Sequence, residues 1–103
     1  MWAQLITMRL KPDKQETLPE LMDQLRAIEQ PGSGLRRSIT MQDQKDPTRV
    51  FTLVVFDSEQ SARERENDPR RAAGLQQVRA TMAEIIDGPP EFVDLVVVND
   101  LAP

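Results

Sequence analysis

The side chains of this sequence that could do chemistry are mostly acids and arginines, and they are densest in residues 56–69, FDSEQSARERENDP. Five acids are interleaved there with arginines, and Arg70 and Arg71 follow directly. With Arg70 and Arg71 included the charges nearly cancel, so this stretch cannot act as a basic patch. Its spacing instead favours a solvated helix with ion pairs four residues apart, such as Glu59 with Arg63.

Asp57 and Glu59, at the start of this stretch, are the nearest the chain comes to a general base. A general base must lie within hydrogen-bond reach of the proton that it removes. Acids in the first turn of a helix more commonly interact with the helix dipole. We therefore expect these two acids to stabilise a helix start.

Three further side chains could line a ligand site. Trp2 could flank a pocket for a flat ligand, although a single Trp at the start of an apolar strand also suits core or interface packing. Arg9 shares a strand face with Leu5, where it would either meet a carboxylate such as Asp94 across facing sheets or bind an anionic ligand. Phe56 would either line the same pocket or help to fill it.

Several kinds of site are excluded by composition, because the chain contains no Cys, His or Tyr. Nucleophile and base pairs, HExxH zinc sites and haem sites with a proximal His all need these residues, so we expect neither a metal ion nor a cofactor. The GSG at 32–34 precedes a strand and does not link a strand to a helix, which argues against dinucleotide binding. Arg36 and Arg37 are expected on opposite faces of that strand, so they form no patch.

Charge and hydropathy give the expected partners and location. Seventeen acids against thirteen bases give a net charge of −4, which disfavours nucleic-acid binding because phosphates need a basic face. No apolar run approaches the roughly 20 residues of a membrane span. The N-terminus, MWAQLITMRL, lacks the basic start and cleavage site of a signal peptide. We expect a cytoplasmic protein without membrane contact.

Hydrophobic periodicity supplies the elements that must position these side chains. Helical spacing predicts a first helix that begins at a capping box, Thr17 with Glu20, and ends near residue 30. A second helical region begins at an N-cap, Ser58, and is broken in two at Asp68. Four predicted strands span residues 2–10, 35–42, 50–57 and 91–99.

The predicted order is β-α-β-β-α-β in a single domain, residues 1–103. This order is typical of the ferredoxin-like α+β fold, an antiparallel sheet with helices on one face. Two strands, VFTLVVF and FVDLVVV, are apolar on both faces, although helices can cover only one. We expect a second copy to cover the other face, giving a homodimer in which two sheets meet. Alternatively, these strands are simply central ones rich in β-formers.

The stretch PGSGLRRSITMQDQKDPTRVFTLVVFDSEQSARERENDP, residues 31–69, resembles the centre of an antibiotic biosynthesis monooxygenase-like (ABM) domain, a dimeric α/β barrel protein. The shared features are a Pro-Gly turn, a DPTR hairpin and a strand that runs into FDSEQSA before a helix. The resemblance implies a pocket between sheet and helices and, in some members, cofactor-free oxidation or haem breakdown. The haem-degrading members carry Asn, Trp and His where this chain has about Ile6, Arg65 and Leu75, which contradicts haem breakdown.

The resemblance implies a function of one of two classes. The first is a cofactor-independent monooxygenase-like protein for a small aromatic or enolisable substrate, with Arg65 or Arg9 binding the substrate anion. Arg65 would point inward, where relatives keep a ring. The alternative is a non-catalytic dimer that binds a small ligand or a partner. An open cavity beside Arg65 favours the first class, and a cavity filled by Met22, Met82 and Phe56 favours the second.

Overall fold

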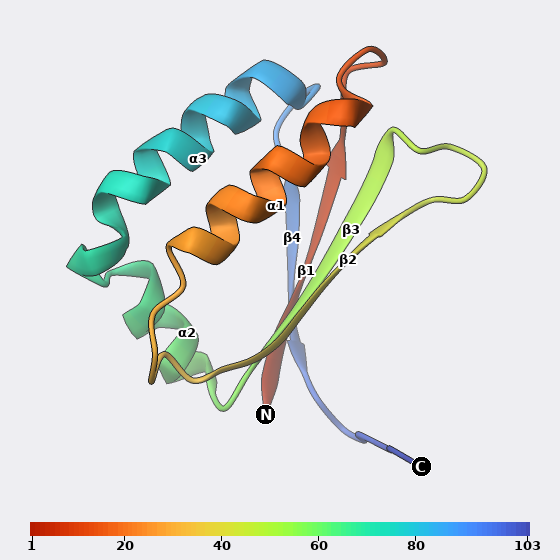
Figure 1. Cartoon of the computed structure of the whole chain (residues 1–103). Coiled ribbons are helices and arrows are strands. Elements are labelled where there is room, and N and C mark those ends of the chain that lie inside the picture. The colour runs from red at the N-terminus through yellow and green to blue at the C-terminus, as the bar shows by residue number, and fades with distance from the viewer.

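The computed structural model describes residues 1–103, and its strands and helices follow the predicted order (Figure 1). All adjacent strands are antiparallel, in the sheet order β2-β3-β1-β4, which confirms the ferredoxin-like α+β fold. The strands are β1 Trp2–Arg9, β2 Leu35–Gln42, β3 Arg49–Phe56 and β4 Glu91–Val96. The helices are α1 Leu18–Ala27, α2 Glu59–Glu66 and α3 Ala72–Ile85, with 3-10 turns at Gln15–Thr17 and Pro69–Arg71.

The first helix begins differently from the prediction. Thr17 makes no side-chain capping hydrogen bond, because the 3-10 turn Gln15–Thr17 runs directly into α1 and gives Thr17 helical backbone angles. The predicted capping box of Thr17 and Glu20 is therefore wrong. Pro19 is accommodated in the first turn of α1, where a backbone N–H is not needed.

The second helical region is broken as the sequence predicts. The Ser58 hydroxyl accepts a hydrogen bond from the Ser61 backbone N–H (3.1 Å), which caps α2. The Asp68 carboxylate accepts one from the Arg70 backbone N–H (2.9 Å), which starts the turn that leads into α3. These two caps orient α2 and α3 separately, so each can cover its own part of the sheet.

The core lies between the helices and one face of the sheet, in two apolar clusters. The larger cluster joins α1 and α3 to the sheet and contains Met8, Leu10, Leu18, Leu21, Ile28, Val50, Val78 and Ile85. The smaller cluster lies beneath α2 and contains Trp2, Val54, Phe56 and Ala62. Ile6 contacts both clusters, so the two parts of the core are continuous.

Helices α1 and α3 lie side by side and come into close contact where Ile28 meets Gly74 (Figure 1). A Cβ atom added to Gly74 would overlap Cγ2 of Ile28. A glycine in a helix interior costs about 1 kcal/mol relative to alanine. The close contact of the two helices gives a structural reason for a glycine at this position.

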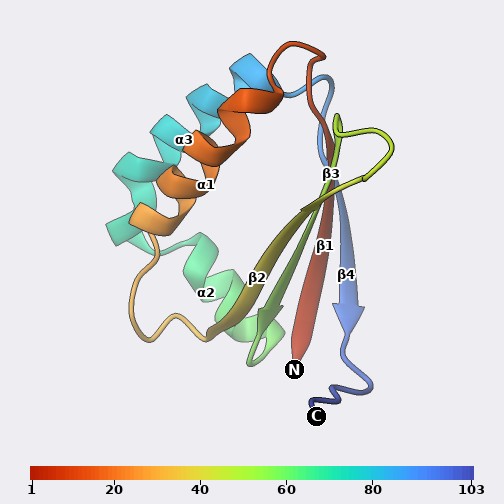
Figure 2. The same ribbon diagram turned by 45° about the vertical axis from the view of Figure 1, so that its right-hand side comes forward.

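The opposite face of the sheet is bare, as Figure 2 shows with the helices all on one side. The strand pairings bring apolar residues together on this open face, namely Ala3, Leu5, Ile39, Met41, Phe51, Leu53, Val55, Val93 and Leu95. All six residues of the edge strand β4 are exposed. None of the helices has both the length and the apolar character needed to cross a membrane.

Candidate functional site

A cavity of about 410 Å³ lies between α1 and the sheet, on the face that the helices cover. Its helical wall is a stripe of residues three or four apart, Met22, Leu25, Arg26 and Glu29. Its other lining residues are Leu35, Ser38, Thr40 and Thr52 from the sheet and Arg65 from α2. The gap continues toward the start of α1 as a second hollow, which shares Met22 and Thr40. The volume is within the usual range of small-molecule sites.

Hydroxyl groups form the part of the cavity wall made by β2 and β3. Ser38 and Thr40 alternate on the helix-facing side of β2, and Thr52 lies opposite Thr40 on β3. The Thr40 and Thr52 hydroxyl oxygens are 3.0 Å apart and share a hydrogen bond. A hydroxyl can both donate and accept, so this wall can bind a ligand carbonyl or hydroxyl group.

The charged end of the cavity is an ion pair between Arg65 and Glu29. The Nε and Nη2 groups of Arg65 donate to Oε2 of Glu29 at 2.9 and 2.7 Å, and the Ser33 hydroxyl donates to Oε1 at 2.6 Å. Burial acts to raise the pKa of Glu29, but hydrogen bonds from Arg65 and Ser33 and the charges of Arg65 and Arg71 outweigh it. The pKa of Glu29 therefore lies below its ordinary value, and this carboxylate is a weak base.

Arg71 lies behind this ion pair and is almost fully buried. Its Nη1 donates to the backbone carbonyl of Arg65 (3.0 Å), while its buried Nε has no partner in the protein. Burial and then the charge of Arg65 lower the pKa of Arg71, against the opposing charges of nearby acids. Glu29 thus has two guanidinium groups close by, only one of which it binds directly.

Arg65 lines the cavity, as expected for an arginine that binds a substrate. Its guanidinium group, however, is already bound to Glu29. It also lies 5.5 Å from the centre of the Phe56 ring, which is within the range of a cation–π contact. Sequence reasoning missed Glu29 and Arg26. Their spacing from Met22 along α1 was the only signal that could have found them.

Trp2 and Phe56, both considered as pocket residues, lie in the smaller core cluster and do not line the cavity. Their ring centres are 6.1 Å apart. Arg63 of α2 lies over Trp2, 5.3 Å from the ring centre. Both rings are buried because α2 covers this end of the sheet. Trp2 and Phe56 therefore pack in the core and do not line a ligand pocket.

Arg9 is exposed on the open face of the sheet, away from the cavity. It donates to Asp46 (3.2 Å) and to Thr48 (3.0 Å) in the hairpin between β2 and β3. The expected pairing with Asp94 is wrong, because Asp94 lies opposite Gln4 on the helix side of the sheet. Its carboxylate accepts hydrogen bonds there from Gln4 and from Arg63.

Asp57 and Glu59 are also outside the cavity. Asp57 lies 3.6 Å from Arg36, and Glu59 lies 3.3 Å from Arg63 in the predicted pair four residues apart. Neither acid is among the residues that line the cavity. No cluster of three or more acids or other metal-binding side chains is present.

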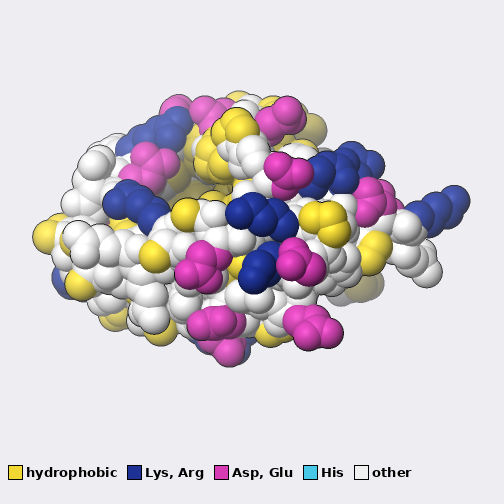
Figure 3. Space-filling model, turned by 90° about the horizontal axis from the view of Figure 1, so that it is seen from above, with side chains coloured by type: hydrophobic (Ala, Val, Ile, Leu, Met, Phe, Trp, Pro, Cys, Tyr) yellow, Lys and Arg dark blue, Asp and Glu magenta, His cyan; other side chains and the backbone are white.

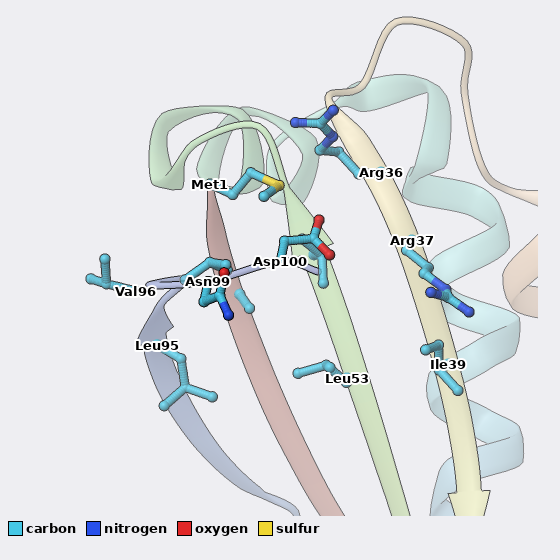
Figure 4. Close-up of a pocket in the computed structure, with 12 residues that line it drawn as sticks. Met1, Arg36, Arg37, Ile39, Leu53, Leu95, Val96, Asn99 and Asp100 are labelled. Atoms are coloured by element: carbon cyan, nitrogen blue, oxygen red, sulfur yellow. The ribbon is translucent and has the colours of Figure 1, made fainter. Parts of the chain in front are cut away.

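A separate cleft, of about 510 Å³, lies on the other side of the sheet, on the open face (Figure 4). Both Arg36 and Arg37 line it, on the other side of the cleft from Leu95 of β4. The expectation that they lie on opposite faces is wrong, because a bulge between Leu35 and Arg37 interrupts the alternation of β2. On the side of the molecule seen from above, acidic and basic side chains are interspersed (Figure 3).

Comparison with known proteins gives a family match. The model of the family described as "antibiotic biosynthesis monooxygenase" matches residues 1–77. No curated protein matches this chain. Among solved structures, a "putative antibiotic biosynthesis monooxygenase" from Nitrosomonas europaea is 21% identical with a TM-score of 0.76, covering 96% of this chain and 100% of its own. A protein of the same description from Chloroflexus aurantiacus is 23% identical with a TM-score of 0.69, covering 99% and 98%. At identities of 21% and 23%, these matches show that the chain shares the fold of the two proteins.

Proposed function

Because this chain belongs to the antibiotic biosynthesis monooxygenase family, we propose that it oxidises a small aromatic or enolisable substrate with dioxygen in the cavity between α1 and the sheet. The observation that carries the proposal is an open cavity with an apolar wall, a hydroxyl wall and Arg65 at one end. Met22 is part of the wall without filling the space, and Phe56 is buried elsewhere.

The proposed reaction needs no cofactor, because the substrate itself reduces dioxygen. A ring CH₂ group that is conjugated with a carbonyl loses a proton to give an enolate, whose carbon transfers electrons to dioxygen and forms a bond to it. Loss of water then leaves a carbonyl at that carbon. One oxygen atom enters the product, and the other leaves as water with the two hydrogens of the CH₂ group.

The residues around the cavity set a requirement on the substrate. Glu29 is the one carboxylate in the lining, and its lowered pKa makes it a weak base. The substrate must therefore ionise readily, as phenols and ring ketones with an acidic CH₂ do. Arg65 has five N–H donors, of which two bind Glu29, and its charge would stabilise a substrate enolate.

A second candidate function is ligand binding without catalysis. It is favoured by the same ion pair, because Arg65 is held by Glu29, and Glu29, the one carboxylate in the lining, is a weak base with a lowered pKa. Under this alternative the cavity binds a small apolar molecule that leaves unchanged.

An oxygen-uptake measurement separates the two. Anthrone, which has a CH₂ group next to its aromatic rings and conjugated with a carbonyl, should give anthraquinone with one dioxygen consumed per product, faster than without protein. Arg65→Gln should lower kcat/KM by roughly ten- to a hundredfold, less than the loss of about 10²–10³ on removal of an oxyanion-hole donor, because Glu29 already neutralises part of the charge of Arg65. Arg9→Gln, on the opposite face, is the control and should leave the rate unchanged. No uptake above the protein-free rate with any phenolic or quinol-type substrate would leave only the binding function.

We also propose that two copies pair through the open face, so that two sheets meet. The support is the row of apolar side chains there, including the exposed Met41, Val93 and Leu95. Light scattering should give a dimer mass for the wild type. Leu53→Asp, at the centre of this face, should give a monomer, while Gln76→Asp on the exposed side of α3 should remain a dimer. A monomeric wild type at micromolar concentration would contradict the pairing.

A further inference from the structure

Arg26 is the one charged side chain in the cavity lining that has no ion-pair partner. It lies on α1, four residues after Met22 and three before Glu29, on the stripe that forms the helical wall. No carboxylate lies within 4.0 Å of it, and its side chain donates no hydrogen bond within the protein. Its residue is exposed, which places it at the mouth of the cavity.

The charges around the cavity do not balance. The lining contains two guanidinium groups, Arg26 and Arg65, and one carboxylate, Glu29. Glu29 is bound to Arg65 and also lies near the buried charge of Arg71. An anion that enters the cavity therefore meets a free guanidinium at Arg26 and a neutralised one at Arg65.

The uncharged residues that line the cavity indicate the chemistry of the rest of such a ligand. Met22, Leu25 and Leu35 can pack against an apolar body. Ser38, Thr40 and Thr52 can hydrogen-bond to a ring oxygen. Glu29 disfavours a dianion such as phosphate, because the added charge would lie in the same cavity as its carboxylate. A single carboxylate matches the planar fork of one guanidinium.

We infer that the ligand of this cavity is an aromatic or polycyclic carboxylic acid that also has a hydroxyl or carbonyl oxygen attached to its ring. Arg26 binds the carboxylate of this ligand. This inference rests on the proposed use of the cavity as a substrate site and narrows the substrate to an acid. Arg65 then acts on the ring oxygen, and Arg26 selects and orients the substrate by its acidic group.

The test compares two probes that differ only in charge, 3-hydroxy-2-naphthoate and its neutral amide, 3-hydroxy-2-naphthamide. Fluorescence titration at pH 7 gives the Kd of each. We expect the acid to bind about tenfold more tightly than the amide, a modest factor because Arg26 is solvent-accessible. Arg26→Gln should remove this preference and leave the Kd of the amide unchanged, and Arg26→Lys should keep part of it. Arg79→Gln, which removes an equal charge from an exposed site on α3, is the matched control.

Each outcome has a defined meaning. An acid preference that survives Arg26→Gln, or equal binding of both probes by the wild type, would overturn the role of Arg26 while leaving the cavity as a ligand site. Binding of neither probe would overturn this inference, and the oxygen-uptake measurement would then decide the proposed function by itself. Acid binding that depends on Arg26, without oxygen uptake for any substrate, would support the inference and reject only the oxygenase reaction.

Discussion

Replacing Glu29 with glutamine tests whether the charged end of the cavity is held together by this one carboxylate. Glu29→Gln keeps the size of the side chain and an oxygen that can accept a hydrogen bond. It removes the charge that Arg65 binds at 2.7 Å and that lies near Arg71. Two guanidinium groups would then share a partly buried site without a counter-charge.

The expected cost follows from the burial of the pair. The side chains of Arg65 and Glu29 are 17% and 25% exposed. Breaking a fully buried ion pair by removing one partner costs about 3–5 kcal/mol. Water can reach part of this pair, so we expect a loss of about 1–3 kcal/mol in the free energy of unfolding. For a domain of this length that corresponds to a fall in Tm of roughly 5–15 °C.

The cost should also depend on pH with a defined sign. Because the pKa of Glu29 is lowered in the folded protein, its contribution to stability is fully present above its ordinary value of about 4.5. That contribution is lost as the pH falls through the lower folded value. The difference in stability between wild type and Glu29→Gln should therefore be largest near pH 7 and shrink below about pH 4.5.

Thermal unfolding followed by circular dichroism, at pH 7 and at pH 3.5, measures both effects. Glu59→Gln removes an exposed glutamate that pairs with Arg63, and this matched control should leave Tm nearly unchanged. The double variant Glu29→Gln/Arg65→Gln should lose less stability than the sum of the two single variants, because neither partner is left unpaired. A Glu29→Gln protein that melts within a degree of the wild type at pH 7 would refute this reasoning.

Three further predictions concern the contact between α1 and α3, the cap of α2 and the hydroxyl wall of the cavity. Gly74→Ala places a methyl group on Cγ2 of Ile28 and should cost about 1–3 kcal/mol in a urea titration, despite the better helix propensity of alanine. The cost should be smaller in an Ile28→Ala background, which lacks Cγ2, and an unchanged midpoint for Gly74→Ala would contradict the close contact. Ser58→Ala removes the cap of α2 and should cost about 1 kcal/mol in the same titration, so full stability would show that the cap is dispensable. Thr52→Val removes the hydroxyl that pairs with Thr40 and should weaken binding of 3-hydroxy-2-naphthamide about threefold; equal binding would exclude this hydroxyl from the site.

Local patterns in the sequence were sufficient to predict the strands and the broken second helix. The alternation of residues 2–10 and the caps at Ser58 and Asp68 depend on neighbours within a few positions, and the structure confirms them. The capping box at Thr17 failed for a local reason as well. The preceding residues adopt a 3-10 turn that propensity does not distinguish from a helix start.

Apart from the pair of Glu59 and Arg63 within α2, the charged contacts could not be predicted, because they depend on register and on segments far apart in sequence. Asp94 lies on the helix side of the sheet since it pairs with Gln4, and the strand order that sets this pairing is not visible in either strand alone. Glu29 and Arg65 are 36 residues apart and meet only after α2 folds over the end of the sheet. Arg36 and Arg37 share a cleft because of a bulge, which no residue in β2 signals clearly.

The contact between Ile28 and Gly74 has a mechanical consequence for how the cavity can open. These residues fix the end of α1 against α3, right beside Glu29 and the charged end of the cavity. The start of α1 is held as well, because Leu18 and Leu21 are buried in the larger core cluster. A movement of α1 as a rigid body would therefore break apolar contacts, so the width of the cavity is set by the fold. We expect a ligand to enter by movement of the exposed side chains at the cavity mouth, such as Arg26.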